Sequence, residues 1–519
     1  VWDGEKQDNH DIYVKLIGTG TPLRLTTDVA NEYMPAWSPD GRHIAFLRRV
    51  LDGYEVLVVP ALGGPERKVG HSTGNGLDWS PDGKCLAIAD EATPRDRPAI
   101  SLLSIDTGEK RRLTTPPPQA RGDFRPAFSP DGRAVVFIRV GGGLVYDIYV
   151  APTAGGEPRR LTSEARSLGG IAWTPDGREI VFSSNRGGPY ALWRIPALGG
   201  TPERVAGAGR DAQDPSICRR TSRLVYTEIF SDANIWRIEM GGATTSPTPV
   251  PASSPVKLIS STRWDESPNL SPDGKRIVFA SDRSGSQEIW ACDSEGLNPV
   301  QLTSFGGPYT GTPRWSPDGQ WIAFDSRPGD NCDIYVISGQ GGSPRRLTTD
   351  PAADAVPTWS RDGRWIYFGS DRTGEWQIWK VAPEGGQTVQ VTKRGGFEAW
   401  ESPDAKLIYY AKGRAIPGIW RVAREGGEET AVPQLAAAGY YRYWAVMERG
   451  IYFVPQKVTP QPVLHFFSFA TQQVTQVLKL DKPPNAAQPG LAVSRDERWI
   501  LYQQTDSNVA DIMLVENFR

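Results

Sequence analysis

Short runs of apolar residues, with polar residues at alternate positions, follow one another along the whole chain. Typical runs are His43–Leu47, Glu179–Ser183 and Trp365–Gly369, which are rich in β-branched and aromatic side chains. A period of two residues is typical of β-strands. No stretch has the 3.6-residue period of an amphipathic helix. We therefore predict an all-β protein with almost no helix.

A motif of the form W-S-P-D-G divides these runs into repeats. It occurs, with small changes, at residues 37–41, 79–83, 128–132, 173–177, 270–274, 315–319 and 359–363. Together with four weaker copies, the motifs lie 42 to 53 residues apart, which matches a four-stranded β-propeller blade. Pro-Asp-Gly predicts a tight turn after the first strand, and a Gly-Gly turn precedes the fourth. We name the four antiparallel strands of each blade a to d, from the axis to the rim.

The number of blades predicts two rings. Third strands occur at twelve places, whereas complete pairs of strands a and b number eleven, because the chain opens at Val1 within a truncated first blade. A ring usually holds four to eight blades, so we predict tandem β-propellers, with two six-bladed rings of four-stranded antiparallel blades.

The boundary between the rings is predicted from composition. Residues 242–255 form a Pro/Ser/Thr-rich linker, so residues 1–241 are expected to form the first propeller and residues 256–519 the second. We expect Val256–Ser260 to close the second ring by pairing with Asp511–Val515, and residues upstream of Val1 to close the first.

The repeated elements W-S-P-D-G, Ser-Asp-Arg and Gly-Gly…Arg-Leu-Thr resemble the WD-repeat-like propeller of the TolB family. The second half also resembles the extracytoplasmic propeller regions of bacterial one-component regulators and receptor-type Ser/Thr kinases. That resemblance implies a periplasmic or extracytoplasmic location, with membrane contact only through a helix upstream of this chain. It also implies a role in sensing or in binding a protein.

Composition and charge narrow the classes of partner. The 58 Lys and Arg nearly balance the 60 Asp and Glu, so nothing marks the segment as a nucleic-acid binder. The four cysteines form no CxxC pair, and no apolar run reaches 18 residues. We expect a protein or peptide partner, or a small ligand at the channel mouth.

Catalytic motifs are absent from the sequence. It contains no G-x-S-x-G elbow, H-E-x-x-H helix, Walker loop or G-x-G-x-x-G fingerprint, and its four His are scattered over different blades. We therefore predict no enzyme, no catalytic residue and no cofactor. Two alternatives stay open, a propeller-type polyuronate lyase and the propeller part of a larger peptidase.

The Asp of each Pro-Asp-Gly turn suggests calcium at first sight. Calcium needs six to eight oxygens that converge on one point, whereas these Asp residues occur once per blade. We predict that each one accepts hydrogen bonds from the amides of its own turn, and we predict no metal site. The Trp of strand a is expected to pack between blades.

A candidate binding site is the rim where d–a connections and b–c loops reach the channel. An acid stands three residues before the Pro of strand a in four blades, and the b–c loops bring arginines to the same face. The predicted rim residues are Glu32, Asp123, Asp265, Glu266, Asp354, Arg186, Arg283, Arg327 and Arg372. They predict either surface salt bridges or a polar funnel for a ligand. The functional hypotheses are a non-catalytic binding or sensor region and a scaffold for envelope proteins.

Overall fold

The computed structural model describes residues 2–6, 9–18, 20–93, 96–141, 146–163, 167–186, 189–218, 220–241, 249–307, 309–328, 331–413, 416–439, 441–455, 462–482 and 490–518. Nearly all the regular structure in these ranges is antiparallel β-sheet, and a single 3₁₀ turn, η2 (Pro433–Leu435), is the one helical element there. The all-β prediction is confirmed. The chain forms two compact units, one of Val1–Arg186, Tyr190–Ile229 and Ala510–Arg519, the other of Gly187–Pro189 and Phe230–Val509.

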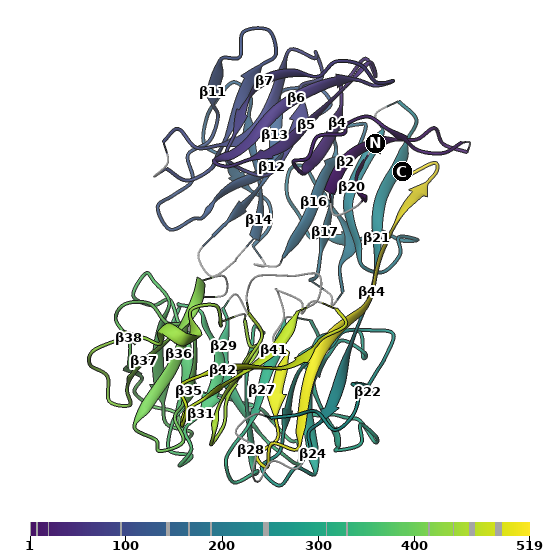
Figure 1. Ribbon diagram of the computed structural model, residues 1–519. Helices are drawn as coiled ribbons and strands as arrows, with labels where there is room; N and C mark the ends of the chain where they lie inside the picture. The colour runs from purple at the N-terminus through teal and green to yellow at the C-terminus, as the bar shows by residue number, and fades with distance from the viewer. Residues whose placement is uncertain are drawn as a thin grey trace. The chain divides into compact units, whose positions relative to one another are not determined.

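Unit 1 contains five sheets that are formed by consecutive strands, and part of a sixth (Figure 1). The first sheet has three strands, β1 (Trp2–Lys6), β2 (Asn9–Val14) and β3 (Leu23–Arg24). The next two are β4 (Glu32–Trp37), β5 (His43–Val50), β6 (Gly53–Pro60), β7 (Arg67–Ser72), and β8 (Leu77–Trp79), β9 (Cys85–Asp90), β10 (Ala99–Ser104), β11 (Lys110–Arg112). The fourth and fifth are β12 (Gly122–Phe128), β13 (Ala134–Val140), β14 (Tyr146–Pro152), β15 (Arg159–Arg160), and β16 (Leu168–Trp173), β17 (Glu179–Ser184), β18 (Ala191–Pro196), β19 (Glu203–Arg204).

Unit 2 contains five further sheets of four consecutive strands. Three of them are β23 (Asp265–Leu270), β24 (Arg276–Ser281), β25 (Glu288–Asp293), β26 (Val300–Gln301); β27 (Thr310–Trp315), β28 (Trp321–Ser326), β29 (Asp333–Ser338), β30 (Arg345–Arg346); and β31 (Asp354–Trp359), β32 (Ile366–Ser370), β33 (Gln377–Val381), β34 (Val389–Gln390). The other two are β35 (Glu398–Glu401), β36 (Leu407–Gly413), β37 (Ile416–Ala423), β38 (Thr430–Ala431), and β39 (Trp444–Val446), β40 (Gly450–Phe453), β41 (Val463–Ser468), β42 (Val474–Lys479).

The sixth sheet of each unit uses two long strands that both units share. β20 (Ala212–Cys218) pairs with the first half of β21 (Arg223–Glu239), whereas the second half of β21 pairs with β22 (Val256–Ile259). β43 (Leu491–Val493) pairs with the start of β44 (Trp499–Val515), and β44 lies beside β21 in the sheet (Figure 1). Counting these halves, each unit has six sheets. The inner strand β23 lies against β43, which closes the ring of unit 2.

Two expectations about the boundary are corrected by these observations. The divide falls within β21, between Ile229 and Phe230, and not in the predicted linker 242–255. Val256–Ile259 pairs with the end of β21 and not with Asp511–Val515, which belongs to unit 1. Each of the two shared strands runs for 17 residues as one continuous strand. A strand pattern gives the type of an element but not its partner, so the sequence could not show where the chain changes ring.

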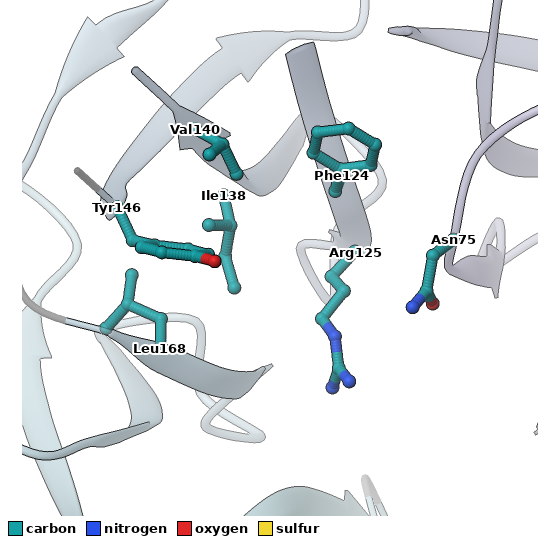
Figure 2. A pocket seen from close by; sticks show the side chains of 7 residues that line it. All are labelled: Asn75, Phe124, Arg125, Ile138, Val140, Tyr146 and Leu168. Atoms are coloured by element: carbon teal, nitrogen blue, oxygen red, sulfur yellow. The ribbon is translucent and has the colours of Figure 1, made fainter. Parts of the chain in front are cut away.

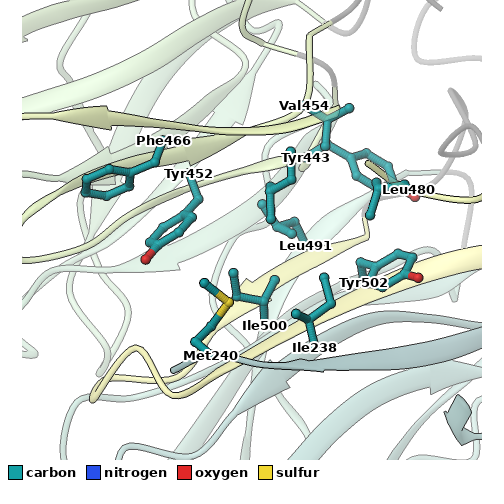
Figure 3. Packing of buried hydrophobic residues seen from close by; sticks show 11 residues of the cluster. Ile238, Met240, Tyr443, Tyr452, Val454, Phe466, Leu480, Leu491, Ile500 and Tyr502 are labelled. Carbon is teal, nitrogen blue, oxygen red and sulfur yellow. The ribbon is translucent and has the colours of Figure 1, made fainter. Parts of the chain in front are cut away.

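The residues on either side of the Pro-rich segment show how it connects β21 to β22. Residues 242–248 lie outside the described residues. On either side, the amide of Gly241 donates to the carbonyl of Val250 at 2.8 Å, and the amide of Ala252 donates to that of Glu239 at 2.7 Å. The segment therefore returns the chain from β21 to β22 within one sheet of unit 2. A cluster of buried side chains from β21, β39–β44 and their connections, including Ile238, Tyr452 and Ile500, packs beside this sheet (Figure 3).

The turn prediction is confirmed by the hydrogen bonds of the W-S-P-D-G motif. In the copy at residues 37–41, Asp40 Oδ1 accepts from Ser38 Oγ at 2.5 Å and from the amide of Arg42 at 3.0 Å. The Ser38 hydroxyl in turn accepts from the amide of His43 at 2.9 Å. These bonds lower the pKa of Asp40 below its usual value, the bond from Ser38 most of all. The Asp residues therefore fix the a–b turn of each blade.

The Trp of strand a joins neighbouring blades, as predicted. The indole N–H groups of Trp79, Trp173 and Trp359 donate to backbone carbonyls of the inner strand in the preceding sheet, at 3.0 to 3.1 Å. All three rings are buried. Trp37 is 41% exposed, because the sheet before it is the three-stranded β1–β3.

Candidate functional site

The predicted rim acids lie at the first residues of the inner strands, as expected, but they are buried. Glu32, Asp123, Asp265 and Asp354 each have no exposed surface. Each carboxylate is bound by an arginine whose side chain is between 11 and 16% exposed. The sequence allowed for surface salt bridges, and the structure instead places these pairs inside the blades.

The arginine partner differs between the two units. In unit 2, Arg283 binds Asp265 at 2.7 Å, and Arg372 binds both oxygens of Asp354 at 2.8 Å, so the Ser-Asp-Arg loops supply the partners that the sequence suggested. In unit 1 the partners are Arg48 for Glu32 and Arg139 for Asp123, from the ends of β5 and β13.

We call these four ion pairs clamps. Each one joins the start of strand a to the end of strand b or to the loop between strands b and c. Arg139 also stacks on Tyr149 and Arg372 on Trp379, each at 4.6 Å from the ring centroid. Burial raises the pKa of Glu32 and Asp354, although hydrogen bonds from their arginines oppose that shift. Because each carboxylate is already bound by its arginine, these residues are poorly placed to receive a ligand.

Of the remaining predicted residues, Glu266 and Arg327 both contact Tyr309 in unit 2, whereas Arg186 lies in unit 1. Glu266 is buried and accepts hydrogen bonds from Gln287 at 2.7 Å and from the Tyr309 hydroxyl at 3.2 Å, and burial raises its pKa to about 8. The Arg327 guanidinium lies 5.9 Å from the Tyr309 ring centroid. Arg186 stacks on Phe182 and Trp193 in unit 1. The nine predicted rim residues are divided between the two units, so they do not all belong to one site.

A different feature marks the inner strands, a β-bulge with a left-handed residue directly before a proline. It occurs at Met34, Arg125, Asp214, Ser267, Thr312 and Val356, with φ between 47° and 62°. We call these the bulge positions. A residue before proline normally avoids helical conformations, and a non-glycine residue at positive φ is strained. Such bulges often redirect a side chain beside a functional site.

The described residues of unit 1 enclose a pocket of about 220 Å³ beside one bulge position (Figure 2). Its lining residues are Asn75, Phe124, Arg125, Ile138, Val140, Tyr146 and Leu168. They come from the third, fourth and fifth sheets. The wall is largely apolar, and the Arg125 and Asn75 side chains supply its charged and amide groups. A concave apolar cavity with few convergent polar groups is the usual form of a ligand site.

Arg125 connects this pocket to two further blades. Its guanidinium donates to the carbonyl of Gly169 and to the carboxylate of Asp214, which is another bulge residue. The Arg125 side chain is 27% exposed and that of Asp214 is 50% exposed. The amide of Arg125 donates to the carbonyl of Asn75 at 3.0 Å, which holds the bulge in place.

Two glycines make room for this pair. A Cβ at Gly76 would lie 2.6 Å from Arg125 Cα, and one at Gly170 would lie 2.9 Å from Asp214 Cα. The sequence reasoning missed Arg125, Asp214 and Asn75. One signal was available, because the strand-a proline repeats in six blades while the residue directly before it differs in each of them.

Among the described residues, no group of three or more His, Cys, Asp or Glu side chains is placed to hold a metal ion. The described helical structure also includes no helix that is long and apolar enough to cross a membrane.

Two ranges of the chain match models of known protein families. The TolB beta propeller domain matches residues 77–308. Over these residues the chain is similar to the TolB family of β-propellers. The Tricorn protease N-terminal beta propeller domain matches residues 287–506, so two propeller matches follow one another along the chain. The predicted TolB resemblance and the tandem-propeller fold are confirmed, whereas the resemblance to one-component regulators and receptor kinases stays a prediction.

Three relatives illustrate the similarity in sequence. An uncharacterized protein of Agrobacterium fabrum is 28% identical over 260 residues, 47% of this chain and 83% of that protein. The uncharacterized peptidase YuxL of Bacillus subtilis is 36% identical over 183 residues, 34% of this chain and 25% of YuxL. The Tol-Pal system protein TolB of Bordetella pertussis is 32% identical over 157 residues, 30% of this chain and 33% of that TolB. The chain thus matches a third or less of YuxL and TolB.

Solved structures include distant propellers. The tricorn protease is 14% identical with a TM-score of 0.35, and the match covers 99% of this chain and 62% of that one. An oligogalacturonate lyase in complex with manganese is 15% identical with a TM-score of 0.31, covering 72% of this chain and 96% of the other.

The prediction that the chain is not an enzyme is corrected by these comparisons. A relative with 36% identity is named a peptidase, and the second family match is to a domain of a protease. That prediction rested on the absence of known catalytic motifs from the sequence. Propeller blades of one type occur beside many chemistries, so missing motifs in the blades say little about the activity.

Proposed function

We propose that this chain binds a peptide or a protein segment in the unit 1 pocket beside Arg125. The observation that carries the proposal is the pocket itself, in which a largely apolar wall faces one partly exposed guanidinium. The Arg125 guanidinium donates to the backbone carbonyl of Gly169, so little ordering of this group is needed when a ligand binds. The TolB-like fold supports a protein or peptide as the ligand class.

A second candidate function is that of a substrate-binding propeller in a larger peptidase. It is favoured by the 36% identity to YuxL and by the match to the Tricorn protease propeller. Both candidates use the same pocket. Incubating the purified chain and the full-length protein with fluorogenic peptides separates them, because only the second predicts turnover, and only by the full-length protein.

An extracytoplasmic location belongs to the same proposal. It rests on the TolB-like family and on the regulator and kinase resemblance. A reporter that fluoresces or matures only outside the cytoplasm, fused to the full-length protein after Arg519, tests it. Activity of a cytoplasm-only reporter would rule out that location.

The binding proposal is tested by selecting peptides on the purified chain and measuring their affinity by fluorescence anisotropy. Tyr146 lines the pocket and packs against the buried cluster of β13, β14 and β17, so Tyr146→Ala removes part of the wall. Tyr54 is the matched control, since it is also partly buried in unit 1 but packs against another cluster. We expect at least a tenfold loss of affinity for Tyr146→Ala and little change for Tyr54→Ala. Equal affinities for both variants would contradict the proposal.

A further inference from the structure

We infer that the ligand of the unit 1 pocket carries a carboxylate, which binds Arg125 by replacing Asp214. This inference rests on the proposed function and specifies the chemistry of the ligand. The pocket wall includes the Arg125 guanidinium and the Asn75 amide but no acidic side chain. A guanidinium at the edge of an apolar cavity favours a planar anion with an apolar group beside it.

The Arg125–Asp214 pair is suited to exchange because it is partly open to solvent. Its side chains are 27% and 50% exposed, and a pair at that exposure contributes little to stability. The clamp between Arg139 and Asp123 in the same unit is different, with 12% and 0% exposure. A ligand carboxylate can therefore compete with Asp214 for Arg125, whereas it cannot reach Arg139.

The backbone around Arg125 keeps the guanidinium in place during such an exchange. Arg125 has a left-handed φ of 50° directly before Pro126, and its amide is bonded to the carbonyl of Asn75. The second hydrogen bond of the guanidinium goes to the carbonyl of Gly169, which a ligand need not displace. Figure 2 shows the Arg125 and Asn75 side chains at the same side of the pocket, with Tyr146, Leu168, Ile138 and Val140 at the other.

Two sources could present a carboxylate next to an apolar side chain, the C-terminus of a peptide or an internal Asp or Glu. Three probes separate them. N-acetyl-leucine has a terminal carboxylate, acetyl-Leu-Glu-amide has only a side-chain carboxylate, and N-acetyl-leucinamide has neither. Binding of each is followed by NMR of the arginine Nε–Hε groups in the whole chain labelled with ¹⁵N-arginine. The Arg125 signal is assigned by its loss in Arg125→Gln.

We expect the two carboxylate probes to shift the Arg125 signal and the leucinamide to leave it unchanged. Arg125→Gln should weaken carboxylate binding about 10- to 100-fold, as expected when a charge-assisted hydrogen bond is lost. Asp214→Asn should strengthen it about 2- to 5-fold, because the competing carboxylate is removed. Arg178→Gln, at an 85% exposed arginine of the same unit, is the control and should change nothing.

The opposite signs of the two variants distinguish a binding role from a structural one, since a disturbed fold would weaken binding in both. Equal shifts with all three probes, no shift with any, or weaker binding in Asp214→Asn would overturn the inference. If selected peptides depend on Tyr146 but not on Arg125, the proposed function stands and this inference fails. If the small carboxylates bind Arg125 but no peptide does, the inference stands and peptide binding fails.

Discussion

Each unit has an arginine with left-handed φ, Arg125 within the inner strand β12 and Arg442 in the turn before β39, and the two have opposite surroundings. Arg125 in unit 1 has φ of 50° and borders a pocket. Arg442 in unit 2 has φ of 54°, has no exposed surface, and donates to the carbonyl of Pro357 at 2.9 Å. The left-handed arginine therefore borders a cavity in one unit and is fully buried in the other.

The blades next to each arginine explain why Arg125 borders a pocket and Arg442 is buried. Beside Arg125, Gly76 and Gly170 leave space, and the inner strands β4, β12 and β20 are only partly buried. In unit 2, β27 and β31 are buried along their whole length, and the amides of Arg442 and Val356 donate to the buried carboxylates of Glu398 and Asp325. Small residues thus open one ring, and a buried network of charges stabilises the other.

The largest expected effect is on the filled ring. Arg442→Ala should destabilise the protein by about 3–5 kcal/mol, because it leaves a cavity and removes the guanidinium next to the buried Glu398. Urea denaturation followed by Trp fluorescence measures the loss. The double variant Arg442→Met with Glu398→Gln should recover part of it, since neither charge is then buried. A loss below 1 kcal/mol for Arg442→Ala would contradict a stabilising role for Arg442 in unit 2.

The next effect depends on pH. Burial raises the pKa of Glu266 from 4.5 to about 8, so the folded state keeps a proton that the unfolded state releases. Stability should therefore fall as the pH rises from about 4.5 to about 8, by about 3 kcal/mol at pH 7. Glu266→Gln, whose carbonyl can still accept from Gln287 and Tyr309, should remove most of this loss. Thermal unfolding of both proteins at pH 5 and pH 7.5 tests it, and parallel curves would contradict the shift.

A smaller loss of stability is expected when the space beside Asp214 in unit 1 is filled. Gly170→Ala places a Cβ 2.9 Å from Asp214 Cα and 3.0 Å from its Oδ1, which should cost about 1–3 kcal/mol and displace the carboxylate. Gly413→Ala is the control, because its Cβ would meet only the Ile416 side chain, at 3.2 Å. Urea denaturation and the anisotropy assay together measure the change. Equal stability and peptide affinity in the two variants would show that space at Gly170 is unimportant.

The smallest effect is expected at the exchangeable pair. Arg125→Ala should change the free energy of unfolding by less than about 1 kcal/mol, because both charges are partly solvated. The small difference should shrink further between 25 and 500 mM NaCl. A loss as large as that of Arg442→Ala would mean that Arg125 is a structural residue.

Much of the fold follows from local sequence signals. The W-S-P-D-G turns, the packing of Trp79, Trp173 and Trp359, and the number of blades depend on contacts within one repeat or between adjacent ones. The ring boundary does not, because β21 and β44 each continue as one strand through the point where the chain changes unit, and these two paired strands lie far apart in the sequence.

The candidate site was predicted less well for a related reason. Charge pairing at equivalent positions correctly suggested Asp265 with Arg283 and Asp354 with Arg372, but burial of these pairs depends on the stacked aromatic rings. Arg125 and Asp214 are 89 residues apart and meet only because the fifth sheet has glycines between them. No spacing rule within a repeat predicts that contact.

The most direct test of the account is an experimental structure of the chain bound to its tightest selected peptide. We predict the peptide in the unit 1 pocket, with a carboxylate on Arg125, an apolar side chain against Tyr146 and Leu168, and Asp214 released from the guanidinium. A peptide bound in the ring of unit 2, or an unoccupied unit 1 pocket with the Arg125–Asp214 pair intact, would contradict it.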